Sequence, residues 1–232
     1  MLSGGIDSST CLYWAKKKFS DVLAITFNYH GRIENEKKAT ARLAKRADVT
    51  NLLEIDVPFI KEYSDFYNNP ILKDDYDKRL SSYIPARNMI FYAICAHFAE
   101  FLCIKWIIGG HNSHDAEFFR DATKEYIKKI NSLLRQGRPI IANNTAKILL
   151  PLVDMDRQDV ISLALKIDVP LELTWSCHNE GKTHCGQCYL PRVNDIYNGY
   201  FIFVVLHQLL RFSLQSEHLL IGNQLSLLYI AS

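Results

Sequence analysis

The sequence predicts an α/β fold in which helices cover both faces of a parallel sheet. Four short apolar runs, rich in β-branched residues, have the character of strands buried on both faces. They are 22–29, 51–57, 103–110 and 148–153. Helical patterns lie between these runs, and a helix between two strands implies a crossover and parallel pairing. With 232 residues, 48% of them apolar, the chain is long enough to bury one good core.

Five helices are expected along the chain, at 8–18, 34–47, 86–102, 122–136 and 156–167. The polar, charged stretch 58–82 is predicted to be a loop-rich insertion. We assign residues 1–192 to one domain and residues 193–232 to a divergent apolar tail. The apolar run 199–214 is interrupted by polar residues and falls short of the roughly 18 apolar residues of a membrane span. We interpret it as a buried or partner-packed element, with a membrane contact or an aberrant C-terminus as the alternatives.

Charge and cysteine content narrow the function classes. A net charge of +2 gives no electrostatic argument for a nucleic-acid partner. The N-terminus lacks the basic and then apolar pattern of a signal peptide, so we expect a cytoplasmic protein. The six cysteines are then expected to be thiols or metal ligands rather than disulfides.

The segment LSGGIDSST at residues 2–10 is the strongest local motif. Gly4 and Gly5 allow a sharp turn that brings backbone N–H groups close to an anion. Asp7 and Ser8 are expected to open and cap the following helix, whose N-terminus favours phosphate. It is not a Walker loop, because it lacks the Gly-Lys-Ser/Thr ending. A plain glycine turn is the alternative.

The wider pattern S-G-G-x-D-S resembles the pyrophosphate loop of the ATP pyrophosphatase superfamily. Within it, six further segments resemble the 7-cyano-7-deazaguanine synthase family, in family order and over most of the chain. They are FNYHGRIENEKKA (27–39), YIPARNMIFYAICAHFAE (83–100), IIGGHNSHD (107–115), FFRDATKEYI (118–127), VPLELTWSC (169–177) and CGQC (185–188).

This resemblance implies a Rossmann-like, adenine nucleotide alpha hydrolase-like fold in which a strand precedes the glycine loop at the sheet centre. Only Met1 and Leu2 precede the loop here, so the first central strand is expected to be truncated. We hypothesise a shortened N-terminus. As a remote alternative, residues 200–206 fill the gap.

The resemblance also implies an activity, which is ATP-dependent conversion of 7-carboxy-7-deazaguanine and ammonia to 7-cyano-7-deazaguanine through an adenylated carboxylate. ATP and Mg²⁺ are the implied cofactors, and Ser3, Asp7 and Ser8 the catalytic residues. The expected nucleotide-binding residues are Leu2, Ser3, Gly4, Gly5, Ile6, Asp7, Ser8, Ser9, Thr10, Cys11, Leu12, Phe27 and Arg87. The expected substrate-binding residues are Arg87, Asn88, Asn112, Asp115, Phe118, Arg120 and Asp121. Asn28 stands where an acidic residue is expected.

Cys177, Cys185 and Cys188 have the spacing C-x7-C-x2-C and are the predicted Zn²⁺ ligands. Pro191 occupies the position of the family's fourth cysteine, which leaves His184, His178 or water as the fourth ligand. Weak or lost metal binding and free thiols are the alternatives.

Two other functions compete with this reading. One is a tRNA-thiolating relative with the same loop, which the near-neutral charge and the single CxxC disfavour. The other is an inactive or repurposed relative that binds a deazapurine or nucleotide. The expected partners are small molecules and a second copy of the chain in a homodimer, with no nucleic acid and no membrane.

Overall fold

The computed structural model describes residues 2–60, 84–137, 146–177 and 179–185, together with the backbone of 226–229. Its centre is a five-stranded sheet with the order β2-β1-β5-β3-β4, in which all four pairings are parallel. The strands are β1 (Asp21–Asn28), β2 (Leu52–Asp56), β3 (Trp106–Ile108), β4 (Lys147–Leu149) and β5 (Ser226–Tyr229). The predicted α/β class with a parallel sheet is confirmed.

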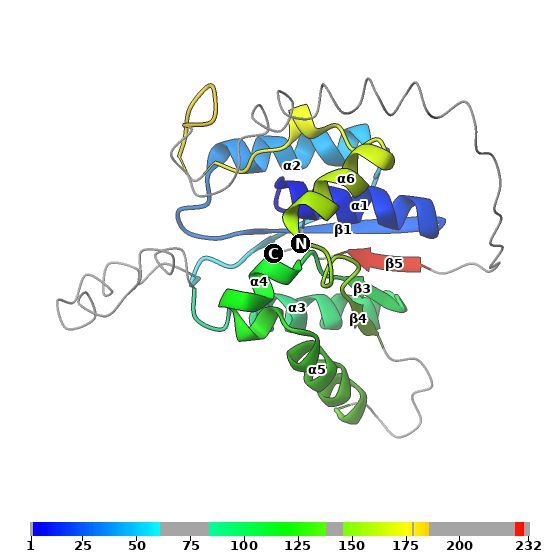
Figure 1. Ribbon diagram of the computed structural model, residues 1–232. Coiled ribbons are helices and arrows are strands. Elements are labelled where there is room, and N and C mark those ends of the chain that lie inside the picture. Colours follow the sequence, from blue (N-terminus) through cyan, green and yellow to red (C-terminus); the bar gives the residue numbers. More distant parts are fainter. Residues whose placement is uncertain (1, 61–83, 138–145, 178, 186–225, 230–232) are drawn as a thin grey trace, which may run out of the picture.

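Six α-helices and two short 3₁₀ turns connect the described strands. The α-helices are α1 (Ile6–Lys18), α2 (Glu34–Arg46), α3 (Arg87–Phe101), α4 (Ser113–Phe118), α5 (Lys124–Gln136) and α6 (Arg157–Lys166). The 3₁₀ turns are Arg120–Ala122 and Leu171–Leu173. Figure 1 shows α1, α2 and α6 on one side of the sheet and α3 and α5 on the other.

Two hydrophobic clusters lie on the two faces of the sheet, because neighbouring residues of a strand point to opposite sides. On one face, Ile25 of β1 and Ile107 of β3 pack with α3 and α5. On the other, Ala24 and Ile108 pack with α1, α2 and α6. Each of these four strand residues is fully buried. This sandwich fixes the carboxyl edge of the sheet, where ligands of such folds bind.

The central position of the sheet holds β5, from the last residues of the chain. Ser226–Tyr229 pairs with Asp21–Ala24 of β1 and, through Leu227–Tyr229, with Trp106–Ile108 of β3. Beyond β5, the Leu2 N–H donates to the Ile25 carbonyl at 2.7 Å, so Leu2 lies beside the next part of β1. The centre of the sheet is therefore filled, and it is filled by 226–229 rather than by 200–206. Residues 200–206 lie outside the described part of the chain.

Most predicted elements form within two residues of their expected ends, with two exceptions. The runs 103–110 and 148–153 give strands of only three residues. The first is shortened because the chain leaves α3 through Cys103 at a φ of 56°, and the second because 151–154 form a turn. Helix α4 was not predicted. Its capping box joins Asn112 and Asp115, a spacing that marks a helix start in sequence.

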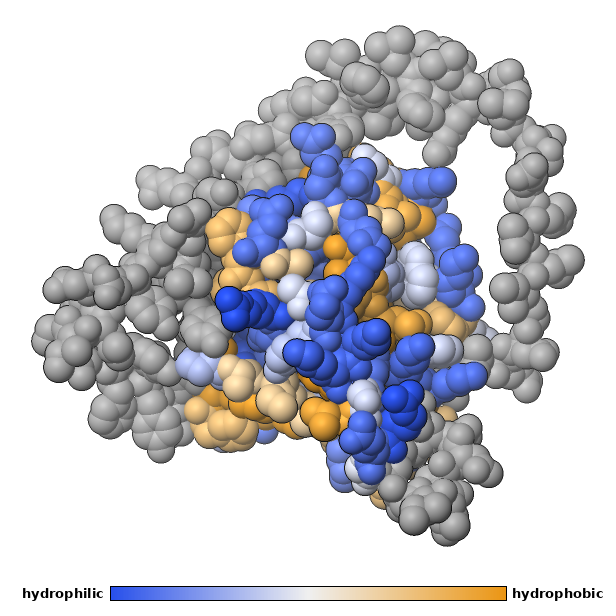
Figure 2. Space-filling model, turned by 60° about the horizontal axis from the view of Figure 1, so that its bottom comes forward, coloured by the Kyte–Doolittle hydropathy of each residue, from blue (hydrophilic) through white to orange (hydrophobic). Residues whose placement is uncertain are grey.

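Figure 2 shows hydrophilic residues spread over one face of the molecule, with apolar residues between them. Within the described ranges, no helix has the length and apolar character needed to cross a membrane. Most of the insertion expected at 58–82 lies outside the described residues, as does the apolar run 199–214.

Candidate active site

The glycine loop (residues 2–9) starts beside β1, where the Leu2 N–H donates to the Ile25 carbonyl, and includes the first turn of α1. Gly4 has a φ of 94°, a conformation that strains residues with a side chain. A Cβ atom at Gly4 would lie 2.7 Å from the Glu36 carbonyl oxygen of α2. The Gly4 carbonyl accepts the Trp175 N–H at 2.8 Å, so the loop is held between α2 and the segment before Cys177. The first glycine is required by both its backbone angle and its packing.

The N-terminus of α1 has no side-chain cap. Helix α1 begins at Ile6 rather than near Ser8, with Gly5 at the N-cap position and no capping hydrogen bond from a side chain. The expectation that Asp7 or Ser8 caps this helix is therefore wrong. Their positions lie inside the first turn, and the Ser8 and Ser9 hydroxyls donate back to the Gly5 carbonyl at 2.9 and 2.7 Å. Uncapped N–H groups at a helix start suit an anion.

Loop hydroxyls add to this anion site. The Ser3 Oγ lies 3.2 Å from the Ser8 Oγ, across the mouth of the loop. The Gly5 N–H donates to Ser3 Oγ at 3.4 Å. Ser8 is almost fully buried, whereas Ser3 is partly exposed. The residues present therefore fit a polyphosphate chain, with Ser3 as the hydroxyl nearest to solvent.

A pair of carboxylates comes from two helices, with Asp7 in the first turn of α1 and Asp115 in the first turn of α4. The Asn112 side chain donates from Nδ2 to Asp7 Oδ1 at 3.0 Å, while its Oδ1 accepts the Asp115 N–H at 3.0 Å. In return, the Asp115 carboxylate accepts the Asn112 backbone N–H at 3.2 Å. Asn112 is 3% exposed and thus links α1 to α4 below the surface. Its amide joins Asp7 to Asp115 in one network.

Desolvation and the nearby Asp115 charge raise the pKa of Asp7 to about 6. Burial likewise raises the pKa of Asp115. Two carboxylates in one partly dehydrated space repel one another, and a divalent cation would relieve that repulsion. The donor set therefore fits Mg²⁺ carried by a nucleotide.

Two arginines flank this pair. Arg157, at the first position of α6, acts on both Asp7 and Asp115, and Arg87 acts on Asp115, each lowering a carboxyl pKa. Arg87 opens α3 after the left-handed Ala86, whose φ is 55°. Burial lowers the pKa of His111 to about 3, so its imidazole is neutral. The site combines two acids and two permanent cations.

The structure places the predicted site residues in different surroundings. Ser3 to Ser8 form the glycine loop and the first turn of α1, and Arg87, Asn112 and Asp115 lie near its carboxylate pair. The side chains of Leu2, Cys11, Leu12 and Phe27 are fully buried in the core, and the Phe27 ring stacks on Phe91 with centroids 4.2 Å apart. Asn88 is buried near the start of α3, and Ser9 and Thr10 are buried in α1.

The remaining predicted substrate residues lie at the end of α4 and in the next turn. The Phe118 ring meets His114 edge-on at a centroid distance of 4.8 Å. Arg120 is exposed. Burial raises the pKa of Tyr92, and the charge of nearby Asp121 adds to that rise. Their substrate roles stay predictions.

The cysteine segment is described in part. The buried Cys177 Sγ accepts the N–H groups of Asn179 and Cys185, each at 3.4 Å. N–H donors directed at a cysteine sulfur suit a metal-ligating position. His184 stacks on Trp175 and accepts the Ser176 N–H at its Nε2. Cys188 and His178 lie outside the described residues, and the described part alone holds no group of three metal-ligating side chains.

Two site residues were missed from sequence, Arg157 and Arg32. Arg157 follows an Asp-x-x-Asp capping box at 156–159, so its place at a helix start was readable. Arg32 lies within the segment 27–39, but nothing in the sequence indicated that its side chain is buried.

Comparison with known proteins identifies the family. Residues 1–192 match the profile of the family described as Queuosine biosynthesis protein QueC. The chain belongs to the QueC family. A 7-cyano-7-deazaguanine synthase from Pyrococcus furiosus is 31% identical over 214 residues, which cover 81% of this chain and 86% of the relative. One from Aliarcobacter butzleri is 34% identical over 194 residues, covering 81% of this chain and 84% of the relative.

Among solved structures, an NMN synthetase from Francisella tularensis aligns with a TM-score of 0.44 and 16% identity, over 94% of this chain and 87% of that one. The resemblance inferred from the motifs is confirmed by the family profile and by the two relatives.

Proposed function

We propose that this QueC-family chain is an ATP-dependent ligase that converts 7-carboxy-7-deazaguanine and ammonia to 7-cyano-7-deazaguanine. The observation that carries this assignment is the uncapped α1 N-terminus behind Gly4 and Gly5, facing the Asp7–Asn112–Asp115 network. The family match supplies the substrate class. Residues 1–192 form the ligase domain in this proposal.

The chemistry requires two activations. A carboxylate oxygen of the substrate attacks the α-phosphorus of ATP, and pyrophosphate leaves. Ammonia then displaces AMP to give an amide, and the proton that ammonia loses passes to solvent. The amide oxygen attacks the α-phosphorus of a second ATP, and pyrophosphate leaves. Loss of AMP, which keeps that oxygen, and of the two amide protons to solvent then gives the nitrile. No side-chain nucleophile is needed, so the protein acts by positioning and charge stabilisation.

Each part of the loop has a role in this scheme. The α1 N–H groups, with Ser3 and Ser8, hold the pyrophosphate that leaves. Asp7 and Asp115 would hold Mg²⁺, which neutralises the phosphate charge when bound. Arg157 and Arg87, whose charges act on these carboxyls, balance the negative charge that develops.

The deazaguanine is assigned to the carboxyl edge between α3 and α4. An Asp121 carboxylate is a natural acceptor for the guanine-like N–H edge of the substrate. Arg87 offers a donor fork for the substrate carboxylate, with Arg120 as the alternative. Phe118, 38% exposed, would cover the flat ring, and Asn88 and Asn112 would support the pocket.

Zn²⁺ is assigned to Cys177, Cys185 and Cys188 as a structural ion. It would fix the segment that runs beside Gly4, because Trp175 donates to the loop and lies two residues before Cys177. Cys177→Ser is expected to lower bound zinc below about half an ion per chain by elemental analysis. The exposed Cys103, in a tight turn after α3, gives the control Cys103→Ser, which should keep full zinc content.

The remaining partners are small molecules and a second copy of the chain, and the reaction belongs in the cytoplasm, where ATP and ammonia are available. The exposed Met89, Phe101 and Leu102 on and after α3 support self-association. Sedimentation equilibrium is expected to give the mass of a homodimer, and a monomer at high micromolar concentration would contradict this part.

Product analysis tests the function directly. The purified chain is incubated with ATP, Mg²⁺, ammonium and 7-carboxy-7-deazaguanine, and the products are measured by mass spectrometry. The amide and nitrile are expected, and Asp7→Ala should abolish both while the protein stays folded. A folded chain that binds ATP without making either product would indicate a repurposed relative, and thiolated RNA in a parallel reaction would indicate a thiolase.

A further inference from the structure

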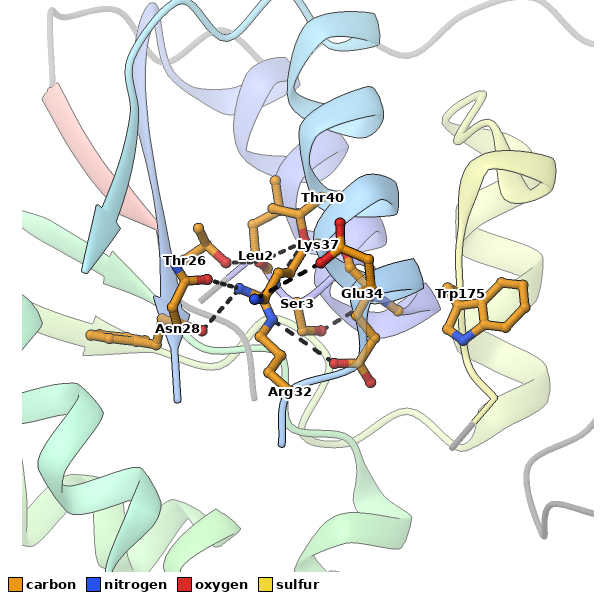
Figure 3. Close-up of polar contacts among 12 residues, drawn as sticks. Leu2, Ser3, Thr26, Asn28, Arg32, Glu34, Lys37, Thr40 and Trp175 are labelled. Carbon is orange, nitrogen blue, oxygen red and sulfur yellow. Dashed lines mark hydrogen bonds and ion pairs between the residues drawn. The ribbon is translucent and has the colours of Figure 1, made fainter. Parts of the chain in front are cut away.

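Arg32 is a buried cation that joins β1 to α2 beside the glycine loop. Its side chain is 2% exposed, and the whole residue 8%. From NH1 it donates to the Phe27 carbonyl at 2.9 Å and to Asn28 Oδ1 at 3.0 Å. From NH2 it donates to Thr40 Oγ1 at 3.0 Å. Figure 3 shows the guanidinium between the end of β1 and the first turns of α2.

Thr40 carries this connection to the chain immediately before Ser3. Its Oγ1 lies 3.3 Å from the Leu2 carbonyl and 2.9 Å from the Glu36 carbonyl. Since a hydroxyl has one hydrogen, it donates to one of these at a time while accepting from Arg32. Thr26 donates to the same Leu2 carbonyl at 2.9 Å. Leu2 is thus fixed from β1 and from α2 together.

The same turn of α2 also supports Gly4. The Glu36 carbonyl and the Thr40 nitrogen would lie 2.7 and 3.2 Å from a Cβ atom at Gly4. The loop backbone therefore rests directly on the α2 backbone, and its position depends on where α2 lies relative to β1. The Arg32 guanidinium bonds to both β1 and α2 and so holds the two elements at a fixed distance.

Asn28 helps to orient the Arg32 guanidinium. Its Oδ1 accepts from Arg32, while its Nδ2 faces Glu54 Oε2 at 3.3 Å and Asp56 Oδ1 at 3.1 Å. An aspartate at this position could not donate to those two carboxylates and would repel them. The unexpected asparagine thereby connects the buried guanidinium to acceptors on β2.

We infer that Arg32 is a positioning residue for nucleotide binding, acting through Thr40 and the Glu36–Thr40 turn to hold the glycine loop in its phosphate-binding shape. It does not itself contact the nucleotide. This inference rests on the proposed function of the loop, and it extends to a residue outside the assigned binding set.

The test compares affinity for ATP with affinity for 7-carboxy-7-deazaguanine, both by calorimetry on the full chain. Arg32→Met is expected to weaken ATP binding about 10- to 100-fold, the loss of one or two hydrogen bonds to a charged group, with deazaguanine affinity changed less than about twofold. Thr40→Val should weaken ATP binding about three- to tenfold, and Thr40→Ser should restore most of it. The double variant should be no weaker than Arg32→Met alone.

Arg42→Met is the matched control. Arg42 is an exposed arginine of the same helix, and its Nε donates to the Lys38 carbonyl of that helix at 3.1 Å. It should leave both affinities unchanged.

ATP affinity within twofold of the wild type in a folded Arg32→Met protein would overturn the inference. An equal fall for both ligands would also overturn it, since that marks a general loss of structure. If Arg32→Met does not fold, the ATP affinities of Thr40→Val and Thr40→Ser are compared instead. Equal ATP affinities in these two variants would refute the positioning role of Arg32. A wild-type chain that binds ATP but makes no nitrile contradicts the proposed function only, whereas one that binds no ATP contradicts both.

Discussion

Replacing Asp7 by asparagine should make the unliganded protein more stable while removing its activity. The Asp7 carboxyl is enclosed beside Asp115, and its pKa is raised from 3.8 to about 6. That raised pKa means that the folded state disfavours the charged form. Asparagine keeps an oxygen that can accept the Asn112 amide N–H but carries no charge.

The size of the effect depends on pH. Below pH 3.8 the carboxyl is neutral in both the folded and unfolded states, so it costs nothing. Between 3.8 and about 6 the folded state holds more protons, and stability falls as pH rises. Above the folded pKa the full penalty applies, about 3 kcal/mol for a pKa difference of this size. Asp7→Asn should therefore gain up to about 3 kcal/mol at pH 8 and about half of that at pH 5.

Urea unfolding followed by tryptophan fluorescence measures this difference at pH 5, 6, 7 and 8. Asp21→Asn is the control, because Asp21 is exposed at the start of β1 and bonds to neighbouring Ser20. Its effect should be below about 0.5 kcal/mol at every pH. A loss of stability in Asp7→Asn, or a gain that does not change with pH, would refute the desolvated pair.

Three further predictions follow from the geometry. Gly4→Ala should reduce ATP affinity at least tenfold and lower the free energy of unfolding by roughly 2 kcal/mol, because Gly4 has a φ of 94° and a Cβ there would lie 2.7 Å from the Glu36 carbonyl oxygen. Gly31→Ala is the control, because Gly31 has a φ of 71° with no atom within 4 Å of a Cβ. It should cost about 1 kcal/mol of stability and leave the ATP affinity measured by calorimetry unchanged. Asn112→Ala and Thr123→Ala each remove a helix cap and should each cost about 1 kcal/mol of stability. Only Asn112→Ala should also slow pyrophosphate release, by about tenfold or more. Equal rates of pyrophosphate release in the two variants would contradict the Asp7–Asn112 link. Deleting 226–232 should lower stability by roughly 3 kcal/mol or more in thermal and urea unfolding, since β1 and β3 lose a shared partner, and an unchanged midpoint would show that β5 is not needed.

Hydrophobic periodicity and β-branched runs in the sequence predicted most helices and strands. Buried strands such as β1 and helices such as α2 and α5 have apolar periodicity or β-branched runs, and these appeared within a residue or two of their expected ends. The glycine loop was readable because Gly4, with its φ of 94° and its close packing on α2, meets a requirement that residues with a side chain do not. Gly5, with a φ of −80°, has an ordinary extended backbone.

Long-range pairing was not predictable in the same way. The four residues of β5 are far in sequence from both strands that they pair with, β1 and β3. Their position in the sheet depends on this long-range pairing and not on a local sequence pattern. The Arg32 fork likewise depends on α2 packing beside β1, and a surface arginine has the same sequence signature. The cap of α1 was wrongly predicted because Ser8 and Ser9 bond back to Gly5 instead.

Oxygen transfer tests the central claim, that the loop activates the substrate carboxylate by adenylation. The chain is incubated with ATP, Mg²⁺, ammonium and 7-carboxy-7-deazaguanine labelled with oxygen-18 in both carboxylate oxygens. Attack on the α-phosphorus predicts that each label leaves in AMP, one per activation, and that pyrophosphate stays unlabelled. Label in inorganic phosphate, with ADP as the nucleotide product, would contradict the assignment.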